Sequence, residues 1–312
     1  MRDAFVRVLA EEMGRNDRIV LITGDLGFGV LRPLWERFPD RMLNAGIAEQ
    51  GMISMAAGLA ATGRTVIVYS IGNFPTLRPL EQIRNDCAYH GADVKIVCVG
   101  GGFVYGSLGM SHHATEDMSV MRAIPDITCF TPGDPAETEA VTLAMLRKSG
   151  TCYLRLGRGN EPKVHTAPVE NWTIPRALTL REGTDVALLS AGGILTQAVD
   201  AAERLARKGI SAKVVSFPCL KPLDEETVKA LLGSFPGILT VEENTVAGGF
   251  GSAVCEIAAE AGSGCRVRRI GLRDCFSTVV GDQQYLRRTY GMDGEAIADK
   301  AEELLNGLRQ DG

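Results

Sequence analysis

The feature that most constrains the fold is an alternation of short apolar runs with amphipathic segments along most of the 312 residues. The apolar runs are continuous, as in strands of a parallel sheet that is covered on both faces, whereas the amphipathic segments have a helical period. In the first half, the predicted strands and helices occupy 3–13, 18–23, 48–61, 65–71, 77–90, 94–99, 127–130, 134–148 and 152–156. This pattern predicts an α/β fold with a doubly wound, mostly parallel sheet.

The alternation lapses between about residues 159 and 182, where three prolines occur and no helical face is evident. It resumes with predicted strands and helices at 186–190, 195–208, 212–217, 225–235, 238–241, 250–261, 267–272 and 293–308. Such a lapse is typical of a linker or a surface crossing between domains. We therefore expect two doubly wound domains, 1–165 and 183–312, joined by a linker at 166–182.

Composition excludes several classes of function. The net charge is −5 and no basic stripe occurs, which argues against nucleic-acid binding. No run of 18 apolar residues occurs and residues 1–14 read as an amphipathic helix, so we expect neither a membrane span nor a secretory signal, and place the protein in the cytoplasm. The eight cysteines are scattered, without a CxxC pair or histidines at ligand spacing, which predicts buried thiols and no metal site. A small-molecule or protein partner is expected.

The sharpest local signal is the segment Asn44-Ala45-Gly46-Ile47-Ala48-Glu49-Gln50-Gly51, in which a loop of small residues leads into an apolar helix. One interpretation of Glu49 is a carboxylate that caps the helix or interacts with its dipole. The other is a buried carboxyl that desolvation keeps protonated, so that it can donate a hydrogen bond to a ring nitrogen. The pattern alone leaves both open.

A second signal is the histidine pair His112 and His113, in a glycine-rich loop that follows the predicted strand 94–99. The carboxyl ends of the strands in an open parallel sheet are where ligands bind, so proton transfer or substrate hydrogen bonding is a functional interpretation. The alternative is a helix cap from Ser111 or Thr115 with the histidines merely nearby. The glycine runs at 100–102 and 248–251 do not fit GxGxxG, and we interpret them as turn and packing glycines.

At Gly46-Ile47-Ala48-Glu49-Gln50 the chain resembles the GIAEQ-type segment of transketolases, and the likeness extends over nearly the whole length. The resemblance implies a thiamine-diphosphate-binding fold, the pyrimidine-binding domain, followed by the transketolase C-terminal domain. It also implies that Glu49 binds the aminopyrimidine ring nitrogen of thiamine diphosphate, drives the amino-to-imino shift and so promotes removal of the thiazolium proton. The protein would then supply the tautomer and the cofactor the carbanion chemistry.

The same resemblance suggests roles for other residues. Asp25 and Leu26, in a segment similar to the family's Ala-Asp-Leu, would approach the cofactor, and Phe74 would stack on the pyrimidine unless it is an ordinary core phenylalanine. His112 corresponds to a histidine that touches the reacting carbonyl and hydroxyl of the sugar, with His113 assisting. Arg158 resembles an arginine that grips substrate phosphate, although Arg155 is an alternative counterpart.

What is missing is equally informative. The family's Gly-Asp-Gly motif, which holds the metal and the diphosphate, appears nowhere, since neither Gly24-Asp25-Leu26 nor Gly133-Asp134-Pro135 fits it. We therefore expect a partner, the N-terminal-half transketolase subunit, to hold Mg²⁺ (or Ca²⁺) in an α2β2 assembly, and this chain to be inactive alone. When the family pattern is aligned outward from His112, Leu108 stands where an acidic residue is expected, and Gly100 stands at about the position of a phosphate-binding histidine. Gly29 stands where the family has a serine. These departures favour a modified or specialised sugar.

We thus expect a subunit of a split transketolase-like enzyme that transfers a two-carbon ketol unit from a ketose or ketose phosphate to an aldehyde. One alternative is the beta subunit of a 2-oxo acid dehydrogenase, which Asn44-Ala45-Gly46 and the stretch 155–160 disfavour. Another is a half similar to 1-deoxyxylulose-phosphate synthase, which Gly157-Arg158-Gly159-Asn160 favours. The last is a non-catalytic regulatory or structural subunit, against which Glu49 and His112 argue.

Overall fold

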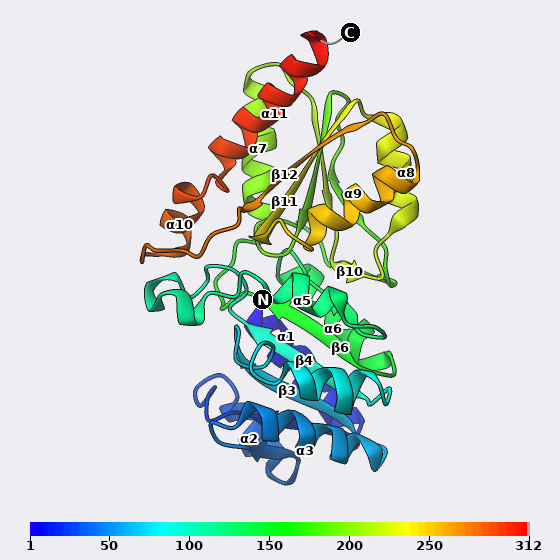
Figure 1. The fold of residues 1–312 in the computed structure, drawn as a ribbon. Helices are drawn as coiled ribbons and strands as arrows, with labels where there is room; N and C mark the ends of the chain where they lie inside the picture. The colour runs from blue at the N-terminus through cyan, green and yellow to red at the C-terminus, as the bar shows by residue number, and fades with distance from the viewer. Residues whose placement is uncertain (311–312) are drawn as a thin grey trace.

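The computed structural model describes residues 1–310, which form two α/β domains, each built on one sheet (Figure 1). The first sheet has seven strands, and all neighbours run parallel except β10 and β5. In spatial order these are β10 (Cys219–Lys221), β5 (Thr128–Phe130), β6 (Cys152–Leu156), β4 (Val94–Val99), β3 (Thr65–Ile71), β1 (Ile19–Thr23) and β2 (Met42–Asn44). The central strands are buried, as continuous apolar runs require.

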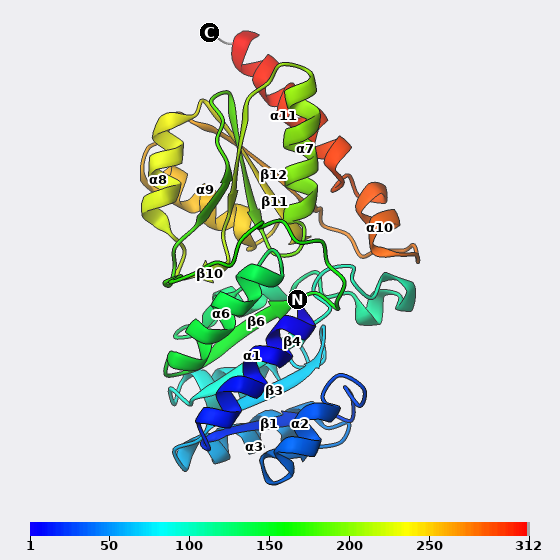
Figure 2. The same cartoon turned by 180° about the vertical axis from the view of Figure 1, so that it is seen from behind.

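Helices cover both faces of the first sheet (Figures 1 and 2). α1 (Arg2–Arg15) packs against α6 (Pro135–Arg147), and α3 (Glu49–Ala61) packs beside α4 (Leu80–Gln82) and the π-helical turn η2 (Ile83–Ala88). In α1, Phe5, Leu9 and Met13 recur every fourth residue and are all buried. The shorter segments are α2 (Arg32–Arg37), η1 (Pro39–Arg41), η3 (Gly106–Leu108), η4 (Met110–His112) and α5 (Asp117–Ala123).

The second sheet has five strands, parallel except for the edge strand β7. In spatial order these are β12 (Arg266–Leu272), β11 (Gly237–Thr245), β8 (Val186–Ala191), β9 (Ala212–Ser216) and β7 (Leu178–Arg181). α7 (Leu195–Arg207) and α11 (Gly294–Gln310) pack together, and α8 (Glu225–Ser234) lies with α9 (Phe250–Glu260) across the sheet (Figure 2). α10 (Gln283–Thr289) reaches down to the first domain.

The predicted fold class is confirmed, with differences at short elements. β7 lies within the segment predicted to be a linker and pairs antiparallel with β9, and β10 comes from the second half of the chain yet joins the first sheet. The helix predicted at 77–90 begins at Leu80, because Pro79 disfavours helical backbone at Arg78. Among residues 1–310, no helix is both long and apolar enough to cross a membrane.

Candidate active site

The parallel strands of the first sheet end at one edge, and that edge carries every residue singled out from the sequence. The strand order reverses between β1 and β3, and such a switch point opens a crevice in which α/β sheets bind ligands. The loops after β1, β2, β3, β4 and β6 carry, in turn, Asp25 with Leu26, Glu49, Phe74, His112 with His113, and Arg158. Residues distant in sequence therefore meet because their strands are neighbours.

Glu49 is the first residue of α3, and its side chain is 6% exposed. The guanidinium of Arg78 donates to Glu49 Oε1 from Nη1 at 3.0 Å, and the other oxygen, Oε2, accepts no hydrogen bond from the described residues. The start of α3 has no side-chain cap. Glu49 makes no capping hydrogen bond, although its place in the first turn of α3 agrees with the helix-dipole interpretation, and it presents one free carboxylate oxygen beside an ion pair.

Phe74 lies beside Glu49 rather than in the core. Its ring is half-buried, with the guanidinium carbon of Arg78 4.1 Å from the ring centroid and the His112 ring edge-on at 5.2 Å between centroids. Tyr105 lies next to His112, with 6.4 Å between the two ring centroids. The guanidinium carbon of Arg158 lies 5.5 Å from the centroid of the Tyr105 ring. We call the resulting series the active-site row, made of Glu49, Arg78, Phe74, His112, Tyr105 and Arg158.

Two members of the row, Arg78 and Tyr105, were missed by sequence reasoning. Arg78 precedes a proline in a turn, and Tyr105 stands in a glycine-rich loop, so neither belongs to a periodic pattern or a motif. Burial raises the pKa of the Tyr105 phenol, with the positive charge of Arg158 acting against the shift. Tyr105 is therefore a neutral hydrogen-bonding group at neutral pH.

Asp25 and Leu26 follow the end of β1, and Leu26 lines a hollow together with Tyr105 and Arg158 of the row. Asn44 ties Asp25 to the segment before Glu49, since Asn44 Oδ1 accepts from the backbone N–H of Asp25 at 2.9 Å and of Gly46 at 3.0 Å. Asp25 is exposed and has a φ of 54°, an unusual value for a residue with a side chain. The open hollow that Leu26 lines measures about 650 Å³.

His113 lies away from the row. It is 2% exposed, its ring packs edge-on against Phe103 at 5.2 Å, and its Nε2 faces the carbonyl of Gly106 at 3.3 Å. Burial lowers the pKa of this imidazole, which favours the neutral ring. The His113 ring is therefore buried rather than open to a ligand, and the substrate role expected for it stays a prediction. Its backbone carbonyl accepts from the Asn73 side chain instead.

Arg155 and Arg158 have different environments. Arg155 is buried, and it donates to Asp117 Oδ2 at 2.8 Å and to the backbone carbonyls of Ala114 and Glu243. Arg158 is exposed, and it borders both the hollow near Leu26 and a smaller one of about 250 Å³ between the domains. Of the two arginines, Arg158 is the one with a guanidinium open to a ligand.

The loop that carries Tyr105 and His112 is anchored by the second domain. An antiparallel bridge between Gly102 and Ala114 closes the loop, and Glu243 Oε1 of β11 accepts from the Phe103 N–H at 2.7 Å. Arg287 of α10 donates from Nε to Glu243 Oε2 at 2.8 Å, and both side chains are buried. Although the second domain contributes no member of the row, it fixes the loop on which two members stand.

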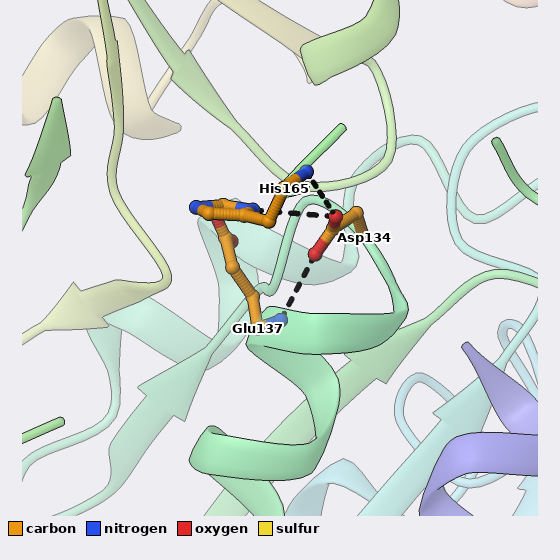
Figure 3. A group of neighbouring side chains, drawn as sticks. All are labelled: Asp134, Glu137 and His165. Atoms are coloured by element: carbon orange, nitrogen blue, oxygen red, sulfur yellow. Dashed lines mark hydrogen bonds and ion pairs between the residues drawn. The ribbon is translucent and has the colours of Figure 1, made fainter. Parts of the chain in front are cut away.

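A separate cluster holds the start of α6 against the chain leaving the first domain (Figure 3). Asp134 caps α6, because its Oδ1 accepts a hydrogen bond from the backbone N–H of Glu137. Its Oδ2 accepts hydrogen bonds from the backbone N–H groups of Val164 and His165, and lies 3.2 Å from His165 Nδ1. Against the effect of burial, these hydrogen bonds lower the pKa of Asp134 to about 2, whereas burial raises that of Glu137 to about 7. The side chains are metal-ligand types, but the Asp134 oxygens are engaged by N–H groups, so the cluster is interpreted as a clamp.

Comparison with known proteins gives the family. Residues 1–163 match the transketolase pyrimidine binding domain, and residues 176–297 match the transketolase C-terminal domain. The chain belongs to the transketolase family. Its parts are therefore the pyrimidine-binding and C-terminal domains expected from the sequence.

Relatives of similar length are named as sections or subunits of transketolases. The chain is 35% identical to a putative transketolase C-terminal section of Methanocaldococcus jannaschii, over 98% of this chain and 96% of the relative. It is 36% identical to the 6-deoxy-6-sulfo-D-fructose transketolase subunit SqwH of a Clostridium species, over 97% of this chain and 94% of the relative. A solved split-gene transketolase, described as an inactive beta4 tetramer, superposes with a TM-score of 0.90 at 33% identity, over 98% of both chains.

Longer relatives contain this chain as one half. A 1-deoxy-D-xylulose-5-phosphate synthase of Thermomicrobium roseum is 35% identical over 96% of this chain but only 48% of its own length. Together these matches identify the chain as a transketolase-type subunit, which matches about half the length of the longer relatives.

The transketolase family uses thiamine diphosphate, and the described residues fit one half of it. The free oxygen Oε2 of Glu49 and the ring of Phe74 offer a hydrogen-bonding atom and an aromatic surface, which suit an aminopyrimidine. Residues that would grip the diphosphate and a metal through Gly-Asp-Gly are absent from the sequence. We call Glu49 together with Phe74 the pyrimidine half-site, as the candidate place for the aminopyrimidine.

Proposed function

We propose that this chain is the pyrimidine-domain subunit of a split, thiamine-diphosphate-dependent enzyme that transfers a two-carbon ketol unit from a ketose to an aldehyde. The observation that carries the proposal is the active-site row. Glu49 and Phe74 both contact Arg78, and His112 packs against Phe74, although these residues come from separate segments of the sequence. Arg158 stands at the other end of the row. The order matches a cofactor end, a reacting centre and an anion end.

Each residue has a role that follows from its position. Glu49 would hydrogen-bond the aminopyrimidine ring nitrogen through Oε2 and exchange a proton with it there, and Phe74 would support that ring. When bound, thiamine diphosphate supplies the carbanion chemistry. His112 is half-buried and hydrogen-bonds the hydroxyl and carbonyl of the sugar. Arg158 offers its exposed guanidinium to an anionic group at the far end of the substrate.

The proposal includes a partner subunit. The lack of Gly-Asp-Gly and the subunit names of the relatives support an N-terminal-half transketolase subunit that holds Mg²⁺ (or Ca²⁺) and the diphosphate. We propose an α2β2 assembly in which the cofactor bridges the two kinds of chain. On its own, this chain is then inactive.

Calorimetry of thiamine diphosphate with Mg²⁺ tests the proposal, on this chain alone and mixed with the N-terminal-half subunit of the same organism. We expect binding only in the mixture, and a loss of binding of at least tenfold in Glu49→Gln. Tight binding to the isolated chain would show that it grips the diphosphate itself. Binding indifferent to Glu49→Gln would favour a non-catalytic subunit.

A second candidate is one half of a 1-deoxyxylulose-phosphate-synthase-like enzyme, favoured by the 35% identity to such synthases. The two reactions differ in donor, because the synthase-like reaction takes a 2-oxo acid and the transketolase-like reaction takes a ketose. Product analysis of the assembled enzyme with each donor and one aldehyde acceptor separates them. Decarboxylation of the 2-oxo acid without ketose turnover would overturn the first proposal, and would also revive the 2-oxo acid dehydrogenase alternative.

A further inference from the structure

One side chain, Arg78, contacts both residues that form the pyrimidine half-site. Its Nη1 donates to Glu49 Oε1 at 3.0 Å, and its guanidinium carbon lies 4.1 Å from the centroid of the Phe74 ring. Glu49 stands at the start of α3 and Phe74 in the loop after β3, so the same planar cation links two elements. The resemblance and the motifs of the sequence gave Arg78 no role.

The geometry points to Arg78 as a positioning residue that braces Glu49 against Phe74 and so shapes the half-site for the aminopyrimidine. A guanidinium can hydrogen-bond a carboxylate at its edge while its face rests on an aromatic ring. Here the edge engages Oε1, which leaves Oε2 as the oxygen free for the ring nitrogen. Arg78 thereby selects which carboxylate oxygen of Glu49 faces the cofactor.

The expected magnitude is moderate because Arg78 is partly in water. Its side chain is 48% exposed, whereas that of Glu49 is 6% exposed. Exposed ion pairs contribute little, although the buried partner and the ring contact add to this one. Loss of Arg78 should therefore weaken cofactor binding rather than abolish it.

This inference rests on the proposed function, so the experiment tests the role of Arg78 and the role of Glu49 together. Thiamine diphosphate with Mg²⁺ is titrated calorimetrically into the full assembly carrying wild-type chain, Arg78→Met, Arg78→Lys or Glu49→Gln. Methionine keeps an apolar stem and removes the charge and the donors. We expect Arg78→Met to weaken cofactor binding about tenfold, and Arg78→Lys to recover part of the loss, because lysine restores the charge but not the planar face.

The matched control is Arg204→Met. Arg204 forms a similar exposed pair with Asp200, at 2.9 Å and with 39% of its side chain exposed, on α7 of the other domain. Arg204→Met should leave cofactor binding unchanged. Thermal unfolding of each variant, followed by circular dichroism, reports whether folding is intact, and the midpoints of Arg78→Met and Arg204→Met should be similar.

The outcomes are distinguishable. Equal binding in wild type and Arg78→Met, with binding lost in Glu49→Gln, would overturn the role of Arg78 and leave the proposed function standing. Tighter binding in Arg78→Met would mean that the guanidinium occupies the cofactor's place, which also overturns the positioning role. Binding unaffected in both Arg78→Met and Glu49→Gln would reject the proposed function itself.

Discussion

At the scale of single residues, position 100 explains a departure from the family. The resemblance places a phosphate-binding histidine there, and this chain has Gly100 with a φ of 93°. A Cβ built on Gly100 would lie 2.1 Å from Cε2 of Tyr105, so the tyrosine ring fills the space that a side chain at 100 needs. Tyr105 in turn lies beneath Arg158. The present place of Tyr105, beside the proposed anion end, therefore requires a residue without a side chain at position 100.

Gly100→Ala should consequently damage both stability and substrate binding. The positive φ and the clash with Tyr105 predict a loss of about 1–3 kcal/mol in the free energy of unfolding, measured by urea denaturation. We expect KM for the substrate to rise severalfold, because Tyr105 must move from beneath Arg158. Gly233→Ala is the control, since its Cβ meets nothing within 4 Å in helix α8 and alanine favours a helix. An unchanged KM in Gly100→Ala would contradict this account.

At the scale of elements, the loop after β4 depends on the second domain. Glu243 is a strand residue of β11, but its carboxylate binds the Phe103 N–H and Arg287. Gly102, with a φ of 66°, lies so close that a Cβ would be 2.6 Å from Cγ of Glu243. The loop with Tyr105 and His112 is thus held at its base by a buried ion pair from β11 and α10.

Glu243→Gln tests this support. Glutamine keeps an oxygen for the Phe103 N–H but leaves Arg287 without its anion, and breaking a buried pair costs about 3–5 kcal/mol. We expect a lower unfolding free energy and faster amide hydrogen exchange in residues 103–113, measured by mass spectrometry. Arg287→Met together with Glu243→Gln should recover part of the stability, because no unpaired charge remains buried. Exchange as slow as in the wild type would mean that the loop holds itself.

At the scale of the whole molecule, the clamp of Asp134, Glu137 and His165 makes stability depend on pH. Glu137 has a folded pKa of about 7 against an ordinary 4.5, so the folded state keeps a proton that the unfolded state loses. The hydrogen bond to Asp134 raises the pKa of His165, whose contribution is present below its ordinary pKa of 6.5 and lost as the pH rises through the raised value. Both groups therefore make the protein less stable as the pH rises from about 5 to 8.

Glu137→Gln should flatten that slope. A shift from 4.5 to about 7 in a fully buried group corresponds to about 3.4 kcal/mol in all, of which the wild type loses about 2–3 kcal/mol between pH 5 and pH 8. Urea unfolding at pH 5 and pH 8 measures the difference, which should be smaller in the variant. Glu242 is also buried with a pKa raised to about 7, so a residual slope is expected and Glu242→Gln should reduce it further. An undiminished slope in both variants would contradict the assignment.

The sequence by itself determined the fold class, the two domains and the family. Continuous apolar strands and amphipathic helices are encoded by local sequence, so they can be predicted from the sequence alone. The segment around Glu49 is contiguous, so the family can be identified from it in the same way. The residue pattern also singled out His112, and the resemblance to the family indicated Phe74 and Arg158. The resemblance favoured Arg158 without excluding Arg155, which differs only in what surrounds it.

Only the tertiary structure decided how these residues meet. Arg78 and Tyr105 belong to the row and His113 does not. The position of each side chain depends on strand order and loop packing rather than on the local sequence pattern. The edge strands β7 and β10 could likewise not be predicted from the sequence, because the pairing of such short strands depends on the neighbouring strand in the folded structure. Local periodicity specifies elements, whereas contacts between distant segments arise only when those elements pack.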